Sequence, residues 1–259
     1  MGLRSTIRNA TLRVYEERLG RSLDRDALPR HIGVIHDGHR RFARATGLPD
    51  YTASYRAGMD KFVDFLGWCA EFDIPHVTCW LLSKENLDRP DEELAPYFDV
   101  LVDLFDRLPE MAADDTRFSV MGSLDLLPER LRTSAKRLVE RRSAGRRTIT
   151  IGLAYAGRQE IVDAVRDLVG KLAAEGVDAD AMAERIDADA IASHLYTAGL
   201  PDPDLVIRTS GESRLSGFLL WQAAYAEYAF VDVYWPAFRH VDFMRSLRDF
   251  TRRERRFGR

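Results

Sequence analysis

Residues 31–42 read His31-Ile32-Gly33-Val34-Ile35-His36-Asp37-Gly38-His39-Arg40-Arg41-Phe42, so that an apolar run leads directly into a polar turn with paired arginines. Such a run is typical of a buried β-strand, and the turn suits a strand-to-helix junction. Similar apolar runs recur at His76 to Leu82, Phe118 to Met121, Thr148 to Ala154, Leu205 to Ile207 and Ala229 to Tyr234. The sequence therefore predicts six strands.

Segments with helical periodicity separate these runs. Apolar residues recur at spacings of three and four in 59–70, 94–105, 131–138 and 161–172. Alternating strands and helices imply crossover connections and a mainly parallel sheet that is covered on both faces. We expect an N-terminal helical segment at residues 1–27 and one α/β domain at residues 28–259. The polar stretch from Ala173 to Ala192 predicts a surface helix pair within that domain.

Charge and cysteine content narrow the classes of function. The chain has 38 lysines and arginines against 41 aspartates and glutamates, so we expect no nucleic-acid partner. Its two cysteines, Cys69 and Cys79, show no metal-binding spacing, and we interpret them as reduced thiols of a cytoplasmic protein. No apolar run approaches the ~20 residues that span a bilayer.

The first segment has an amphipathic pattern. Leu3, Ile7, Ala10 and Val14 fall on one helical face, with arginines around it. A helix packed on the body of the protein is the simpler interpretation. Peripheral contact with a membrane surface is the alternative.

Polar clusters follow three of the expected strands, where open parallel sheets bind their ligands. In the first cluster, Asp37 can ligate Mg²⁺, Gly38 lets the backbone approach a phosphate closely, and Arg41 can pair with phosphate oxygens. A solvated turn with surface arginines is the alternative. The second cluster is Ser83-Lys84-Glu85-Asn86-Leu87-Asp88-Arg89-Pro90. It could equally be a helix start, because Pro90 can open a helix and Glu93 falls in its first turn.

The third cluster is the most specific. Arg208-Thr209-Ser210-Gly211-Glu212-Ser213-Arg214-Leu215-Ser216 follows the run at Leu205 to Ile207 directly. Arginines, hydroxyls and a glycine at one strand end predict a phosphate-binding loop. Glu227 is a lone carboxylate in an apolar neighbourhood, a pattern more typical of a structural acid.

In this order the three clusters resemble the undecaprenyl diphosphate synthase, or cis-prenyltransferase, family. The resemblance runs from about Leu28 to Gly258 and includes the segments Ala154 to Arg158, Phe218 to Gln222 and Arg252 to Gly258. It implies a single α/β domain with a six-stranded, mostly parallel sheet, a hydrophobic tunnel and a homodimer. Within the family, the chain is most similar to the short-chain actinobacterial branch that makes Z-farnesyl diphosphate.

The resemblance also implies roles for individual residues. Asp37 would hold Mg²⁺ at the allylic diphosphate, with Glu227 helping to place the metal. Arg208, Arg214 and Ser216 would hold isopentenyl diphosphate. His39 and Asn86 would take part in the chemistry beside Asp37. The other substrate-binding residues that the resemblance implies are Gly38, Arg40, Arg41, Phe42, Tyr55, Ser83, Glu85 and Arg89.

The chain departs from the family pattern at residues that the resemblance places in the active site. His39 stands where the family has an asparagine, and an imidazole differs from an amide in shape and titrates near neutrality. Tyr55 replaces a histidine, and Leu87 replaces the tryptophan of a mobile loop. Leu81 takes a place that is small in long-chain members. If its side chain points into the tunnel, growth of the prenyl product should stop near fifteen carbons. The alternative is that Leu81 is an ordinary core residue that faces a helix.

The favoured function is condensation of isopentenyl diphosphate with a short allylic diphosphate to give a short Z-prenyl diphosphate. Head-to-middle coupling of two allylic diphosphates is an alternative, motivated by His39. A catalytically silent partner subunit is another alternative, against which stand Asp37, Arg208, Arg214, Ser216 and Glu227. A dinucleotide-binding protein is disfavoured, because no GxGxxG follows the first strand.

Overall fold

The computed structural model describes residues 15–253. Its six strands form one sheet in the order β3-β4-β2-β1-β5-β6, and every neighbouring pair is parallel. The strands are β1 (His31–Ile35), β2 (His76–Trp80), β3 (Thr116–Met121), β4 (Arg147–Gly152), β5 (Leu205–Arg208) and β6 (Glu227–Phe230). The predicted α/β class with six strands is confirmed.

The sixth strand differs most from its predicted place. It begins two residues early, because Glu227 pairs with Leu205 at the start of β5. It ends at Phe230, and the chain then turns toward the loop after β5, where the Val233 carbonyl accepts a hydrogen bond of 2.7 Å from the Ser210 N–H.

Helices form where the periodic segments predict them. The predicted segments lie in α3 (Tyr51–Glu71), α4 (Asp91–Met111), α5 (Glu129–Arg141) and α6 (Gly157–Ala174). The expected surface pair is α7 (Ala179–Arg185) and α8 (Ala188–Ala192). Further helices are α2 (His39–Thr46), α9 (His240–Thr251) and the short 3₁₀ turns η1 (Arg25–Ala27), η2 (Lys84–Asp88), η3 (Leu124–Leu126) and η4 (Trp235–Ala237).

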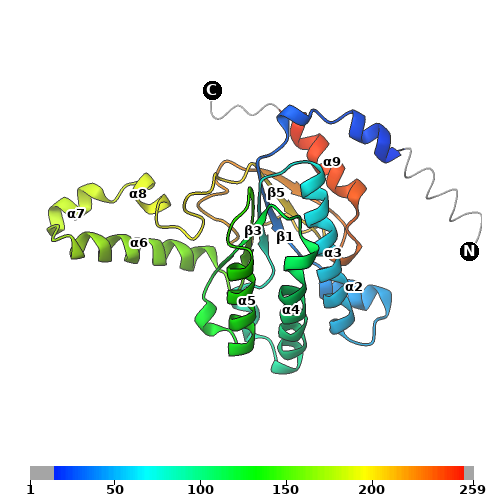
Figure 1. Ribbon diagram of the computed structural model, residues 1–259, viewed down its shortest axis with the longest axis horizontal. Helices are drawn as coiled ribbons and strands as arrows, with labels where there is room; N and C mark the ends of the chain where they lie inside the picture. The colour runs from blue at the N-terminus through cyan, green and yellow to red at the C-terminus, as the bar shows by residue number, and fades with distance from the viewer. Residues whose placement is uncertain (1–14, 254–259) are drawn as a thin grey trace, which may run out of the picture.

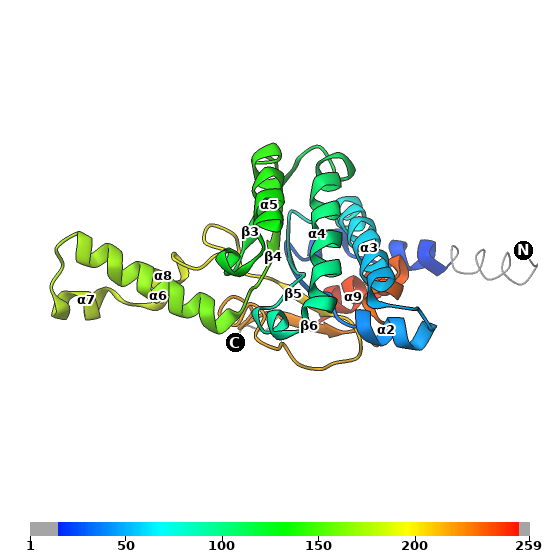
Figure 2. The ribbon, with the colours of Figure 1, turned by 90° about the horizontal axis from the view of Figure 1, so that it is seen from below.

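The two faces of the sheet are covered differently. Helices α3, α4 and α5 stand side by side on one face, while α6 extends away from the body with α7 and α8 (Figures 1 and 2). The larger core cluster lies beneath these helices and also includes Phe243 and Leu247 of α9. A smaller cluster on the other face joins Ile35, Trp80 and Val206 to Phe218 of the segment after β5. Helices cover the first face, and much of the second is covered by that irregular segment.

The prediction of peripheral membrane contact concerns the first residues of the chain. Leu3, Ile7, Ala10 and Val14 lie outside the described residues, and helical backbone is described at residues 15–21. Within residues 15–253, every helix is too short or too polar to cross a membrane. Peripheral contact stays a prediction from the sequence.

A buried histidine in β1 makes stability depend on pH. His31 is fully buried, with its Nδ1 2.6 Å from the Pro201 carbonyl and its Nε2 2.8 Å from the Thr78 hydroxyl. Burial lowers the pKa of His31 to about 4. In the unfolded chain the residue titrates near its ordinary value of ~6.5, so between these values the unfolded state binds the extra proton.

We therefore expect the free energy of unfolding to fall as the pH drops from about 6.5 to 4, with His31 contributing at most about 3 kcal/mol of that loss. Urea unfolding at several pH values measures it. The variant His31→Gln should show a shallower dependence over this window, whatever its absolute stability. The same slope in both proteins would contradict this assignment.

Candidate functional site

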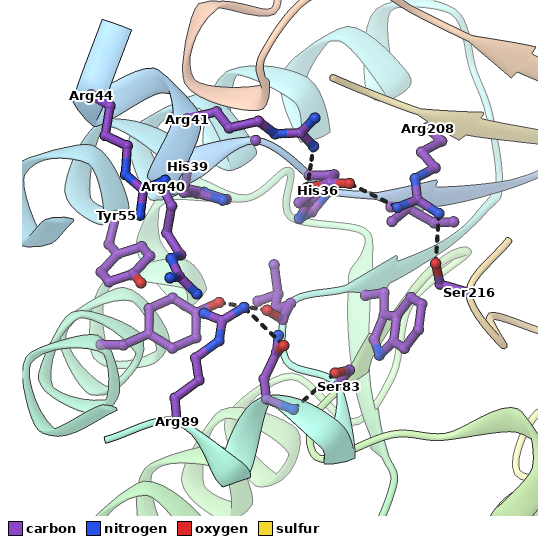
Figure 3. A pocket seen from close by; sticks show the side chains of 17 residues that line it. His36, His39, Arg40, Arg41, Arg44, Tyr55, Ser83, Arg89, Arg208 and Ser216 are labelled. Carbon is purple, nitrogen blue, oxygen red and sulfur yellow. Dashed lines mark hydrogen bonds and ion pairs between the residues drawn. The ribbon is translucent and has the colours of Figure 1, made fainter. Parts of the chain in front are cut away.

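A pocket of about 400 Å³ opens at the carboxyl ends of β1, β2 and β5. It is lined by Ile35, His36, Asp37, Gly38, His39, Arg40, Arg41, Arg44, Tyr55, Trp80, Leu81, Ser83, Asn86, Arg89, Tyr97, Arg208 and Ser216 (Figure 3). The structure thus brings together residues from all three polar clusters, because parallel strands end at the same edge of the sheet.

Asp37 lies between two arginines from different elements. Its Oδ2 accepts a hydrogen bond of 2.8 Å from Arg208 at the end of β5, and its Oδ1 accepts one of 3.2 Å from Arg41 in α2. Burial alone would raise the pKa of Asp37, but the hydrogen bond and charge of Arg208 and the charge of Arg41 outweigh it and lower this pKa. The carboxylate is therefore ionised at neutral pH.

Helix α2 begins at this carboxylate because of Gly38. The residue has φ of 108°, which favours glycine, and it precedes the first turn of the helix. A Cβ at Gly38 would lie 2.8 Å from the Tyr234 ring and 3.0 Å from the Ser210 Cβ. Only glycine fits there without displacing neighbours, and it leaves the amino end of α2 facing the pocket, where backbone N–H groups favour anions.

The loop after β5 is held against both Asp37 and α2. The side chain of Arg208 is 5% exposed and donates to the Ser216 hydroxyl over 2.9 Å and to the Arg214 carbonyl. Arg41 donates to the Ser210 hydroxyl over 2.6 Å and to Glu212 over 2.7 Å. The end of β5 and the loop after it therefore present one buried guanidinium and one hydroxyl to the pocket.

Glu93 organises the opposite wall. This carboxylate accepts hydrogen bonds from the Tyr55 hydroxyl over 2.8 Å and from Arg89 over 3.0 Å, and it lies 3.8 Å from Arg40. Arg89 also donates to the Asn86 side chain over 2.8 Å. Burial and the Glu93 carboxylate raise the pKa of Tyr55, so its hydroxyl keeps its proton.

The two histidines beside Asp37 face inward. His36 stacks on Trp235 with ring centroids 3.8 Å apart, and burial lowers its pKa well below the ordinary value. Burial lowers the pKa of His39 to about 4, and a Cβ on Gly58 would lie 2.1 Å from its Nε2. The ring edge of His39 that carries Nε2 is thus turned against α3. The lowered pKa of His39 is opposite to the expectation that it titrates near neutrality, because its Nε2 is buried.

Charge and polarity divide the pocket into two parts. Five arginines line it, namely Arg40, Arg41, Arg44, Arg89 and Arg208, against the single carboxylate of Asp37. Apolar and aromatic walls are formed by Ile35, Trp80, Leu81 and Tyr97. A cationic mouth beside apolar walls suits a ligand with an anionic head and a hydrocarbon tail.

Three predicted residues lie near the pocket without lining it. Phe42 lies in α2 and Glu85 is exposed in η2. The side chain of Arg214 is 62% exposed and pairs with Glu212, so it is its backbone carbonyl that contacts Arg208. Spacing along the chain places these residues near the pocket, but it does not fix where their side chains point.

Glu227 requires a correction. It is paired with Leu205 at the amino end of β5, whereas Asp37 follows the carboxyl end of β1. Its side chain pairs with Arg253 over 2.6 Å. The expectation that Glu227 helps to place a metal beside Asp37 is therefore not met within one chain, because the two carboxylates lie at opposite ends of the sheet.

Sequence reasoning missed several lining residues. Tyr97 belongs to the helix that the periodicity at 94–105 predicts only as a packing element, and Arg44 lies in α2, which none of the periodic segments predicts. A weak signal was available for Tyr97, which lies four residues after Glu93 and thus on the same face of α4. Glu93 itself was interpreted only as part of a helix start.

Comparison with known proteins agrees with this geometry. The family model for putative undecaprenyl diphosphate synthase matches residues 35–258. The (2Z,6E)-farnesyl diphosphate synthase of Thermobifida fusca is 48% identical over all of both chains, and that of Mycolicibacterium smegmatis is 46% identical over 97% of each. A solved structure, lavandulyl diphosphate synthase from Lavandula x intermedia in complex with dimethylallyl diphosphate, superposes with a TM-score of 0.83. It is 29% identical and covers 90% of this chain and 100% of its own.

The sheet order, the pocket at its carboxyl edge and these matches together define an isoprenyl-transferring enzyme. The chain belongs to the cis-prenyltransferase family.

The geometry predicts that the pocket binds inorganic diphosphate. Arg41→Ala removes a guanidinium at the amino end of α2, so affinity should fall roughly tenfold, the scale of one charge-assisted hydrogen bond. Titration calorimetry measures it. Arg130→Ala is the control, because Arg130 forms an exposed ion pair with Asp99 on another part of the surface. Equal affinity in wild type and Arg41→Ala would contradict the assignment.

Proposed function

We propose that this protein condenses isopentenyl diphosphate with a short allylic diphosphate and releases a Z-prenyl diphosphate of about fifteen carbons. The observation that carries the proposal is that five arginines line the pocket beside apolar walls. These walls are formed by Ile35, Trp80, Leu81 and Tyr97. The names of the Thermobifida and Mycolicibacterium relatives support the same regiochemistry and length. Head-to-middle coupling of two allylic diphosphates is not favoured, since the Thermobifida and Mycolicibacterium relatives, which are 48% and 46% identical, are named (2Z,6E)-farnesyl diphosphate synthases.

Different residues of the pocket would bind the two substrates. The amino end of α2, with Arg40 and Arg41, would hold the allylic diphosphate, and Arg208 with Ser216 would hold isopentenyl diphosphate. The allylic C–O bond breaks and its electron pair leaves with the diphosphate, while the isopentenyl double bond forms the new C–C bond. A proton then passes from the isopentenyl unit to a diphosphate oxygen, which leaves the new alkene. The arginines stabilise the leaving charge, and the apolar walls keep water from the cation.

Mg²⁺ fits this site as an ion carried with the diphosphate. Asp37 is ionised, lines the pocket and lies at the amino end of α2. Within residues 15–253, no group of three or more acidic, histidine or cysteine side chains could hold an ion alone. Mg²⁺ commonly takes one or two carboxylates together with substrate phosphates and water. Bound in this way, it would draw negative charge off the leaving diphosphate.

Turnover should therefore require both the carboxylate and a divalent cation. Asp37→Ala should lower kcat by roughly a hundredfold or more, since it removes the group that orients two arginines and the ion. Asp64→Ala, at an exposed pair with Lys61, is the control. Product formation from isopentenyl and geranyl diphosphate, with and without EDTA, measures both effects. Full turnover in EDTA would contradict the metal requirement, and full turnover of Asp37→Ala would contradict the site.

Leu81 is the residue that we propose limits chain length. It is 7% exposed, follows β2 directly and lines the pocket. Its carbonyl accepts a hydrogen bond of 2.5 Å from the Tyr97 hydroxyl, which fixes the backbone at this point. A growing tail would meet this branched side chain, and close-packed sites tolerate extra volume poorly.

Leu81→Ala should release longer Z-products, which chromatography and mass spectrometry of the chain lengths would show. Leu131→Ala is the matched control, because Leu131 is fully buried in α5 away from the pocket. That variant should lose about 2–5 kcal/mol of stability with its product length unchanged. An unaltered product from folded Leu81→Ala would rule out Leu81 as the limiting residue.

We also propose that the enzyme is a homodimer. Strand β6 is an edge of the sheet, and the adjacent Tyr225 is 81% exposed. Helix α6 extends from the body with Val162 and Val169 exposed along it, and its first residue contacts the segment that carries the exposed Leu220 (Figure 1). An edge strand and apolar side chains on neighbouring elements suit a self-complementary interface.

Val162→Arg should shift sedimentation toward the monomer at micromolar concentration, because it places a charge within this interface. Met111→Arg is the control, since Met111 is an exposed apolar residue at the end of α4. A wild-type protein that sediments as a monomer would contradict the proposal. So would a Val162→Arg protein that dimerises as tightly as wild type.

A further inference from the structure

A tryptophan at the end of β2 lies where the two substrates would meet. The sheet register places Gly152, Trp80, Ile35 and Arg208 in one row across four neighbouring strands. Residues paired in this way project from the same face of a parallel sheet. Trp80 and Arg208 thus flank Ile35 on one face, and Asp37 follows Ile35 by two residues. The Trp80 side chain lines the same pocket as both charged groups.

The indole is held by aromatic packing. Phe218 stacks on it with ring centroids 5.4 Å apart and planes inclined by 12°, and Tyr155 packs against it edge to face at 6.0 Å. Phe218 follows Ser216 by two residues, so the same loop positions the hydroxyl and backs the indole. Gly152 lies directly beside the ring, since a Cβ there would be in van der Waals contact with its Cδ1 at 3.4 Å. The ring is therefore fixed in orientation before substrates bind.

The indole N–H does not explain the choice of tryptophan. Among the described residues, 15–253, the Trp80 Nε1 is buried and has no hydrogen-bond partner. Such a group lowers stability, and phenylalanine would fill much of the same space without it. Tryptophan offers instead the ring with the strongest attraction for a cation over its face.

We propose that the Trp80 ring stabilises the positive charge that develops on the allylic carbon as its C–O bond breaks. The inference rests on the proposed function and adds a catalytic residue to it. The electron pair of the bond leaves with the diphosphate toward the arginines, and the indole lies on the apolar side of the same pocket. It adds no covalent step and accepts no proton. The positive charge is present in the transition state and absent from the bound substrate. The indole therefore stabilises the transition state more than the bound substrate, which speeds ionisation.

Substitutions at Trp80 test this through the rate of the chemical step. Single-turnover rates with saturating substrates should fall roughly three- to thirtyfold in Trp80→Leu and by a smaller factor in Trp80→Phe. The stability of Trp80→Phe should match or exceed that of wild type, because the unpartnered N–H is gone. Trp68→Phe is the control, since Trp68 packs against Lys61 and Phe243 away from the pocket.

Binding of a cation analogue provides a readout that a purely structural role would not affect. The probe is an ammonium analogue with nitrogen in place of the cationic carbon, titrated with inorganic diphosphate, beside a neutral carbon analogue of the same shape. Trp80→Phe and Trp80→Leu should weaken the ammonium analogue and leave affinity for the neutral one unchanged. Equal weakening of both analogues, or an unchanged single-turnover rate in Trp80→Leu, would overturn the proposal. A wild-type protein with no turnover would instead overturn the proposed function.

Discussion

The carboxylate of Asp37 lies between two guanidinium groups that reach it from different parts of the chain. Arg208 comes from the end of β5 and Arg41 from the first turns of α2. The Thr209 hydroxyl adds a third connection, since it accepts from the Asp37 N–H over 3.0 Å and donates to the Asp37 carbonyl over 2.8 Å. These contacts fix α2, the loop after β5 and the end of β1 relative to one another, and both proposed diphosphate sites depend on that arrangement.

The same contacts explain how one pocket can serve two anions. One carboxylate cannot neutralise five arginines, so the pocket keeps an excess of positive charge. Part of that excess is balanced from outside by Glu93 on one wall and Glu212 on the other, each of which orients arginines that line the pocket. The arginines are thus positioned before a ligand arrives, which lowers the cost of ordering them on binding. The apolar walls come from the ends of β1 and β2 and from α4, and they would meet a hydrocarbon tail.

The fold could be predicted well from the sequence, because each strand is a short apolar run and the runs alternate with helical periodicity. The site could be predicted in outline for a related reason: the polar clusters follow strands that end at one edge. Side-chain direction could not be predicted. Arg214 and Glu85 share a loop or turn with true lining residues but point elsewhere, and the spacing of Tyr97 from Glu93 is only a weak signal that Tyr97 lines the pocket. The metal role of Glu227 came from the family resemblance and not from the strand pattern, and Glu227 lies at the opposite end of the sheet from Asp37.

The central claim is that this pocket aligns an allylic diphosphate and isopentenyl diphosphate for a single cis condensation. Incubating the protein with geranyl diphosphate, isopentenyl diphosphate and Mg²⁺, and then determining the mass and double-bond geometry of the product, tests it most directly. The account predicts a fifteen-carbon product whose new double bond is Z. An E double bond, or a branched product formed equally well without isopentenyl diphosphate, would contradict it.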